Sequence, residues 1–274
     1  MGRVALVIEY DGTAYAGWQR QPHAPTVQGA LEDTLARITQ APCPVTAAGR
    51  TDAGVHAVGQ VAHLDTGTRL GPEALRDALN ALLPPDIVVR RALQVAADFH
   101  ARRDARWRVY RYVVLSRAQP SAFLRRYVHH VPGGLRLEPM RAGAQALLGR
   151  HDFAAFRVAG TATSSTVCEM HAVRIEARGD LVIFTVAADR FLRQMVRRVV
   201  GSLLWVGQGA LPPDAIGAIL RSADNAQAAP PAPAHGLYLA HVEYAPGRLD
   251  RAAGSQAGRN GRGEPGAQRR SQML

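Results

Sequence analysis

The chain has 274 residues, of which 47% are hydrophobic and 20% charged, a composition typical of folded proteins and not of disordered ones. All 33 basic residues are arginines, so reactions that need a lysine amine, such as Schiff-base formation or P-loop phosphate binding, are excluded. Against 22 acidic residues these arginines give a net charge of +11, which suits a polyanionic partner because guanidinium groups bind phosphates well.

Hydrophobic periodicity predicts alternating strands and helices in the first part of the chain. Thr26 follows Pro25 and begins one helical pattern, and a second begins at Pro72 and ends before Pro84 and Pro85. The predicted strands are 3–10, 44–48, 57–64, 86–95 and 107–115, and the predicted helices are 26–38 and 72–82. The order β-α-β-β-α-β, followed by one more strand, is that of a ferredoxin-like (RRM-like) unit.

The second part of the chain repeats this order more loosely. Its predicted helices are 138–148, 190–206 and 212–221, and its predicted strands are 166–178, 180–188 and 236–244. We therefore expect an α+β protein of two ferredoxin-like halves, with mixed or antiparallel sheets and helices packed on one face. The expected divisions are a first half at 1–115, a connecting segment at 116–135, a second half at 136–247 and a tail at 248–274.

The tail differs from the rest of the chain in composition. It is rich in Gly, Gln, Arg and Ser and has almost no large apolar residues, so we expect residues 248–274 to be disordered. Arginines exceed acidic residues in the remaining chain as well, and we therefore expect the folded part to be basic in its own right.

Neither a structural metal nor a membrane partner is expected. Cys43 and Cys168 are too few for a disulfide framework or a set of zinc ligands. No apolar run approaches the roughly 18 residues of a membrane span, and residues 3–8 alternate where a signal peptide would be continuously apolar. We therefore expect a cytoplasmic protein.

The segment from Ala48 to Ala57 is a polar loop with glycines between two predicted strands. Asp and Gly favour turns, so Asp52 has an ordinary structural explanation. Arg50 favours a catalytic one, because a neighbouring guanidinium keeps a carboxylate ionised and available as a nucleophile or base. Loops on a rigid sheet also commonly carry catalytic groups, so Asp52 and Arg50 are candidate site residues.

Residues 49–57, Gly-Arg-Thr-Asp-Ala-Gly-Val-His-Ala, resemble the signature of the tRNA pseudouridine synthase A (TruA) family. Further blocks are similar to the family in the same order along the chain. They are residues 10–19, 26–32, 99–102, 110–112, 151–153, 191–201 and 236–237, so that the resemblance covers residues 3–245.

This resemblance implies that the chain isomerises uridine to pseudouridine in the tRNA anticodon arm, at positions 38 to 40, without metal or cofactor. It implies that Asp52 is the catalytic nucleophile and that the protein is a homodimer in which one tRNA contacts both subunits. The sequence leaves open which of the three uridines react. It also leaves open whether Asp52 attacks the sugar, attacks the base or removes a proton from the sugar.

Two more site residues follow from the resemblance. Tyr110 matches the tyrosine that stacks on the target base, a role that suits an extruded base. The spacing of Tyr110 and Tyr112 is also that of core residues on one strand face, which we expect for Tyr112. Arg197 matches the arginine that pairs with the catalytic carboxylate.

The predicted helix 190–206 gives a separate argument for an anion near Arg197. Arg193 and Arg197 stand at i and i+4, a like-charge spacing that is unfavourable unless an anion lies beside it. A solvated basic face is the simpler expectation for Arg193 and Arg198.

Two other functions compete with the synthase. A non-catalytic RNA-binding module would use its sheet to stack bases, but aromatic residues make up only 6% of the chain. A nucleoside hydrolase or glycosidase would need a second carboxylate to activate water, and the loop of Asp52 offers none nearby. The sequence therefore favours a tRNA pseudouridine synthase.

Overall fold

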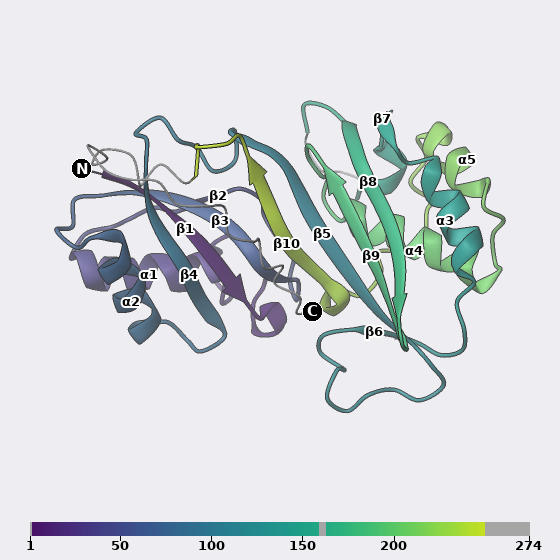
Figure 1. Cartoon of the computed structure of the whole chain (residues 1–274), viewed down its shortest axis with the longest axis horizontal. Coiled ribbons are helices and arrows are strands. Elements are labelled where there is room, and N and C mark those ends of the chain that lie inside the picture. The colour runs from purple at the N-terminus through teal and green to yellow at the C-terminus, as the bar shows by residue number, and fades with distance from the viewer. Residues whose placement is uncertain (1, 159–162, 250–274) are drawn as a thin grey trace, which may run out of the picture.

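The computed structural model describes residues 2–158 and 163–249 (Figure 1). Its first half holds the strands β1 (Gly2–Tyr10), β2 (Thr46–Ala47), β3 (His56–Thr66) and β4 (Ile87–Val95), with the helices α1 (Val27–Thr39) and α2 (Pro72–Leu82). The strand order is β4-β1-β3, and β2 pairs with residues 62 and 63 of β3, on the edge away from β1. This is the strand order of a ferredoxin-like unit. The helices begin where the sequence predicts, because the Thr26 hydroxyl accepts a hydrogen bond from the Gly29 amide and Pro72 occupies the first turn of α2.

The second half holds the strands β5 (Ala105–Ser116), β8 (Val167–Arg178), β9 (Leu181–Ala188) and β10 (Leu237–Tyr244). Its helices are α3 (Leu137–Gln145), α4 (Met195–Gln208) and α5 (Ala215–Ser222). The order β10-β5-β9-β8 repeats that of the first half. Two short strands were not predicted: β6 (His129–Val131) beside β5, and β7 (Gly149–Asp152) at the edge beyond β8. Three 3₁₀ turns complete the elements: η1 (Gly12–Ala14), η2 (Ala154–Phe156) and η3 (Ala234–Gly236).

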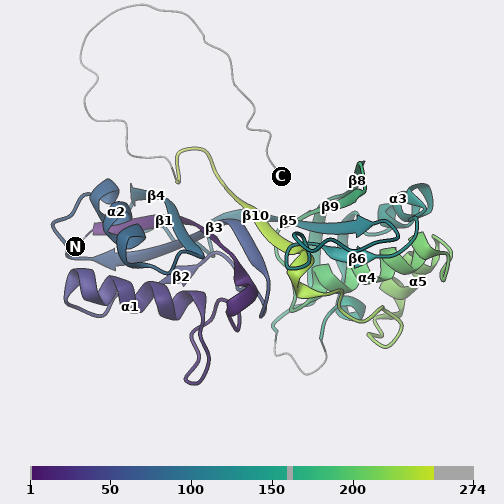
Figure 2. The same ribbon diagram turned by 90° about the horizontal axis from the view of Figure 1, so that it is seen from below.

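The two halves share one 10-stranded mixed sheet, and the predicted α+β class is confirmed. The last strand, β10, joins them: it pairs parallel with β3 and antiparallel with β5 (Figure 1). Figure 2 shows α1 and α4 on the same side of this sheet. Because β5 takes the first-strand position of the second unit, we propose that the halves divide before β5 and not at residue 115.

Helix α4 begins later than the sequence predicted. Gln194 has a left-handed backbone with φ of 59°, which interrupts the chain before Met195, so the predicted helix 190–206 was wrong over its first five positions. Arg193 consequently lies outside the helix, and the expected i, i+4 pair of Arg193 and Arg197 does not exist. The buried stripe of the helix is present, formed by Met195, Val196, Val199, Val200, Leu203 and Leu204.

The predicted tail lies almost wholly outside the described residues, which end at Leu249. Its first residue, Arg248, is anchored: its guanidinium contacts Asp98 at 3.1 Å and also pairs with Asp104. None of the described helices is long and apolar enough to cross a lipid bilayer.

Candidate active site

The loop between β2 and β3 is held by hydrogen bonds from three directions. The Thr51 hydroxyl lies 2.7 Å from the Tyr10 hydroxyl, and the Thr51 carbonyl accepts the Trp18 amide at 3.0 Å. On the other side, the Gln60 amide group donates to the Gly49 carbonyl at 2.8 Å. The backbone on both sides of Asp52 is therefore fixed before any substrate arrives.

Two glycines of the 10–19 block let that block pack directly under the loop. A Cβ on Gly17 would lie 2.6 Å from the Thr51 carbonyl oxygen, and Gly17 has a left-handed φ of 96°. A Cβ on Gly12 would lie 2.0 Å from the Val55 carbonyl oxygen. No other residue type fits at these approaches, since real Cβ atoms do not come so close to backbone oxygen.

Asp52 faces an arginine from the other half of the molecule. Its Oδ2 lies 3.5 Å from Nη1 of Arg197, on the first turn of α4, and the two side chains are 27% and 14% exposed. The Arg197 Nε donates to the Ala232 carbonyl at 2.6 Å, which fixes the guanidinium in place. The carboxylate is thus partly open to solvent and paired with a positioned cation.

Arg50 does not provide this pairing. Within the described part of the chain it forms no ion pair with Asp52, although the two residues share the loop. The cation in contact with Asp52 is Arg197, and the role expected of Arg50 stays a prediction. Sequence distance was misleading, because neighbours in an irregular loop can point in different directions.

Tyr110 lies on β5, close to the loop and mostly buried, with 7% of its surface exposed. Phe191 packs edge-on against it, with ring centroids 5.1 Å apart. Burial, with smaller contributions from Tyr10 and the Asp52 charge, raises the pKa of the Tyr110 hydroxyl, so it stays neutral at physiological pH. A base can stack on so buried a ring only when a neighbour such as Phe191 moves. Tyr112 is fully buried, as predicted for a core residue.

Arg108 is a residue that the sequence argument missed. Only 9% exposed, it donates hydrogen bonds to four carbonyl oxygens: Ala48 at the start of the loop, Arg102, Ala105 and Asp189. Burial lowers the pKa of its guanidinium. Arg108 thereby ties the Asp52 loop to the chain leading to Phe191. The sequence has 33 arginines, and only the inward-facing position of Arg108 in the alternation of β5 could have distinguished it from the others.

His56 directly follows the loop, and its ring forms hydrogen bonds to the backbone of two other segments. Its Nδ1 accepts the Gly12 amide at 3.0 Å, and its Nε2 lies 3.1 Å from the Arg126 carbonyl, to which it donates. Nδ1 is also 3.1 Å from a carboxylate oxygen of Asp11. The Gly12 bond requires an unprotonated Nδ1, whereas a bond to Asp11 requires a protonated one. The Gly12 amide can only donate, so Nδ1 accepts there, and the Asp11 carboxylate is bound by Thr13 and Tyr127.

The remaining basic residues of this region differ in their surroundings. Arg193 is exposed, as expected for a solvated residue. Arg198 is partly buried, and its guanidinium donates to the carbonyls of Asn225 and Ala228. The expectation that Arg198 belongs to a solvated basic face was therefore wrong. Across residues 2–158 and 163–249, no three His, Cys, Asp or Glu side chains gather as metal ligands would.

The site thus combines one carboxylate, one fixed cation and one aromatic ring, drawn from three separated segments. A single ionised carboxylate in this setting can act as a nucleophile or as a base. The Tyr110 hydroxyl lies beside Gly49 of the same loop, and the Asp52 charge contributes to the raised pKa of this hydroxyl.

Comparison with known proteins assigns the family. A family model described as tRNA pseudouridine synthase matches residues 6–104 and 144–245. A tRNA pseudouridine synthase A of Methylobacterium nodulans is 48% identical over 245 residues, covering 89% of this chain and 96% of that protein. One from Syntrophotalea carbinolica is 46% identical, covering 90% and 98%.

Among solved structures, a chain of the archaeal box H/ACA sRNP Nop10-Cbf5 complex matches with a TM-score of 0.34 and 13% identity. The match covers 89% of this chain and half of that one, and a likeness this low adds nothing to the assignment. The sequence relatives, by contrast, match over nearly their whole length. On their evidence and that of the family model, this chain belongs to the tRNA pseudouridine synthase family.

Proposed function

We propose that this chain isomerises uridine to pseudouridine in the anticodon arm of tRNA, at positions 38 to 40, with Asp52 as the catalytic nucleophile. The observation that carries the proposal is the 3.5 Å contact between Asp52, in the signature loop, and Arg197. Relatives that are 46–48% identical are named tRNA pseudouridine synthase A, which supports the same reaction.

The chemistry balances without any added reactant. The bond between N1 and C1′ of uridine breaks, the base turns, and a new bond joins C5 to C1′. The hydrogen on C5 leaves as a proton, and N1 gains a proton, so that nothing is oxidised or reduced. One ionised carboxylate is sufficient for such a reaction, whether it attacks the sugar or the base or removes a proton from the sugar.

The other site residues have supporting roles in this proposal. Arg197 holds the Asp52 carboxylate in position through the contact between its Nη1 and the carboxylate Oδ2. Tyr110 stacks on the extruded base once Phe191 turns aside. Arg50 adds positive charge to the loop, where a polyanion approaches.

The substrate and setting belong to the same proposal. The net charge of +11 supports association with tRNA, since phosphate contacts dominate RNA affinity. We also propose that the protein is cytoplasmic and works as a homodimer, in which one tRNA contacts both subunits.

The test is incubation of the purified full chain with unmodified tRNA transcripts, followed by chemical mapping of pseudouridine with and without EDTA. We expect pseudouridine within positions 38 to 40 in both conditions. Release of free uracil would favour a glycosidase, and tRNA binding without any product would favour a non-catalytic module. Either result would overturn the proposal.

A further inference from the structure

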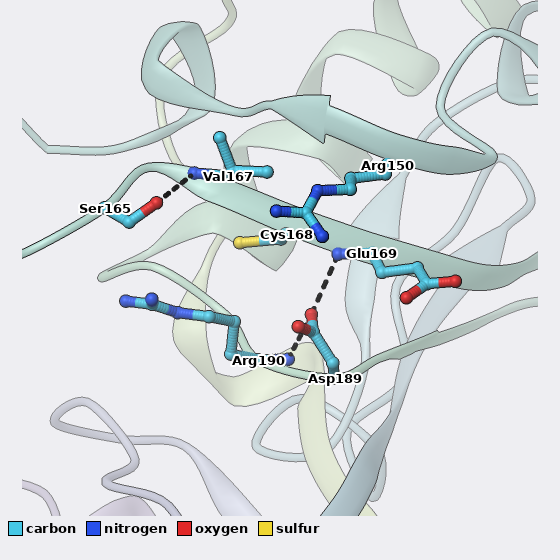
Figure 3. Close-up of a pocket in the computed structure, with 7 residues that line it drawn as sticks. All are labelled: Arg150, Ser165, Val167, Cys168, Glu169, Asp189 and Arg190. Carbon is cyan, nitrogen blue, oxygen red and sulfur yellow. Dashed lines mark hydrogen bonds between the residues drawn. The ribbon is translucent and has the colours of Figure 1, made fainter.

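A pocket of about 240 Å³ lies at the edge of the sheet, outside the site described above (Figure 3). It is lined by Arg150 on β7, by the segment that leads into β8, and by the turn after β9. The lining residues are Arg150, Ser165, Val167, Cys168, Glu169, Asp189 and Arg190. The pocket is large enough to hold a phosphate group.

Its two arginines have no counter-charge. Among the described residues neither Arg150 nor Arg190 forms an ion pair, and the guanidinium of Arg190 donates only to the Thr163 hydroxyl at 3.2 Å. Figure 3 shows the Cys168 sulfur between the guanidinium groups of Arg150 and Arg190. Neither guanidinium is paired with a carboxylate that the structure describes, so an anion that enters the space between them is stabilised.

The acidic residues of the pocket do not neutralise these arginines. Asp189 Oδ1 accepts the amides of Glu169 at 2.8 Å and Arg190 at 2.7 Å, so its charge is directed at the main chain. The Glu169 carboxylate points away from Arg190 in Figure 3. Ser165 adds a hydroxyl that accepts the Val167 amide at 3.1 Å and keeps its own hydrogen for another acceptor.

The chain connects this pocket directly to the candidate active site. Asp189 and Arg190 immediately precede Phe191, the ring that packs against Tyr110. Arg108 binds the Asp189 carbonyl at 2.6 Å and also the Ala48 carbonyl at the start of the Asp52 loop. The pocket and the site are therefore linked through Arg108 and through the segment from Asp189 to Phe191.

We propose that this pocket binds a phosphodiester group of the RNA substrate, close to the nucleotide that enters the active site. The inference rests on the proposed function, because it takes RNA as the substrate. Arg150 and Arg190 bind the non-bridging oxygens from two sides, since guanidinium groups match phosphate geometry. Such a contact positions the strand without reading its sequence.

The test is ethylation interference on an end-labelled tRNA transcript, with the full chain and with Arg150→Gln and Arg190→Gln. For the wild type we expect ethylation at one or two anticodon-arm phosphates to block binding, and in each variant we expect that interference to disappear. Each variant should lose about tenfold or more in tRNA affinity. The slope of log affinity against log salt should also fall by about 0.7–0.9.

Arg174→Gln is the matched control, because Arg174 is exposed on β8 and lies outside the pocket. It should change the affinity less than twofold and leave the interference pattern intact. Arg150→Lys and Arg190→Lys should keep the salt slope. An unchanged interference pattern in both Gln variants, or equal losses in Arg174→Gln, would overturn the proposal.

A free phosphate ion offers the same chemistry from another source. Titration of inorganic phosphate at constant ionic strength separates the two sources. If phosphate binding is lost in Arg190→Gln but the ethylation-interference pattern of that variant is unchanged, the assignment to RNA is overturned. Conversion of tRNA by the same wild-type preparation is scored separately. If the wild type binds tRNA without forming pseudouridine, the proposed reaction is rejected, and ethylation interference still decides the role of the pocket. If it does not bind tRNA, both the proposed reaction and the phosphodiester site are rejected.

Discussion

Arg197 and Ala232 are joined by two hydrogen bonds that run in opposite directions. The Arg197 Nε donates to the Ala232 carbonyl at 2.6 Å, and the Ala232 amide donates to the Arg197 carbonyl at 3.0 Å. The guanidinium is therefore held against the backbone at Nε, and its Nη1 contacts the Asp52 carboxylate at 3.5 Å.

Arg197→Ala should lower the turnover number by about 10²-fold, the usual effect of removing one positioned charge donor from an active site. Single-turnover kinetics on a tRNA transcript would measure it. Arg193→Ala is the control, since Arg193 carries the same charge nearby but is exposed. Equal, modest losses in both variants, with a shared drop in salt dependence, would indicate that Arg197 merely attracts phosphate.

Asp52→Asn keeps the shape of the side chain and removes its charge. We expect pseudouridine formation to be abolished and tRNA affinity to stay within several fold, because phosphate contacts dominate binding. Pseudouridine mapping and filter binding give the two readouts. Asp33→Asn, an exposed carboxylate on α1, should leave both unchanged. Turnover above a few per cent of wild type would remove Asp52 from its proposed role.

Tyr110 can be tested for stacking separately from its hydroxyl. Tyr110→Phe retains the ring and should bind an anticodon-arm RNA as the wild type does. Tyr110→Ala should lose about 1–3 kcal/mol of binding free energy, the usual value of one base–aromatic stack. Titration of a fluorescent RNA would compare them, and equal affinities of the two variants would mean that the ring does not meet the base.

Arg108→Met should destabilise the fold by at least about 1–3 kcal/mol, the cost of leaving the buried Ala48 carbonyl without its donor. The partly buried carbonyl groups of Ala105, Asp189 and Arg102 also lose their donor. Urea unfolding followed by circular dichroism would give the change in unfolding free energy. Arg106→Met is matched in chemistry and strand, and within the described part of the chain the Arg106 guanidinium contacts the Trp107 ring, 5.2 Å from its centroid. Its cost should be at most about 1 kcal/mol, so similar values for both variants would contradict the structural role of Arg108.

Gly17→Ala should destabilise the protein by about 1–3 kcal/mol, since Gly17 has a positive φ and its new Cβ would collide with the Thr51 carbonyl. Displacement of the loop should also slow turnover. Gly67→Ala is the control, because a Cβ there meets nothing within 4 Å. Thermal unfolding and turnover of the two variants provide the comparison, and a harmless Gly17→Ala would show that the loop tolerates displacement.

The sequence predicted most elements because their signals are local. Thr26 and Pro72 are start signals that act within one turn, and both helices begin there. Helix α4 lacks such a signal: Phe191 and Leu192 continue its apolar pattern, and nothing in the sequence marks Gln194 as left-handed. The strands β6 and β7 span only 3 and 4 residues, too short for a periodic pattern to emerge.

The same limit applies to the site. Asp52 could be chosen from its loop and from the family signature, but its cation could not be identified from proximity along the chain. Arg50 is two positions away and makes no ion pair with any residue that the structure describes, whereas Arg197 reaches Asp52 from 145 positions away. Contacts of that kind depend on how the two halves pack, and no local pattern encodes them.

The position of β10 has a consequence for biosynthesis. Because this last strand lies between β3 and β5, the central sheet stays open until residues 237–244 have left the ribosome. The first ferredoxin-like unit can complete its own pairings earlier, as can the hairpin of β8 and β9. The positions of β3 and β5 that pair with β10, however, remain unpaired on the nascent chain, and such edges can associate with other chains. A nascent chain that stops before β10 therefore has the Asp52 loop without the strand that closes the sheet around it, and we expect such a fragment to be both inactive and prone to aggregate.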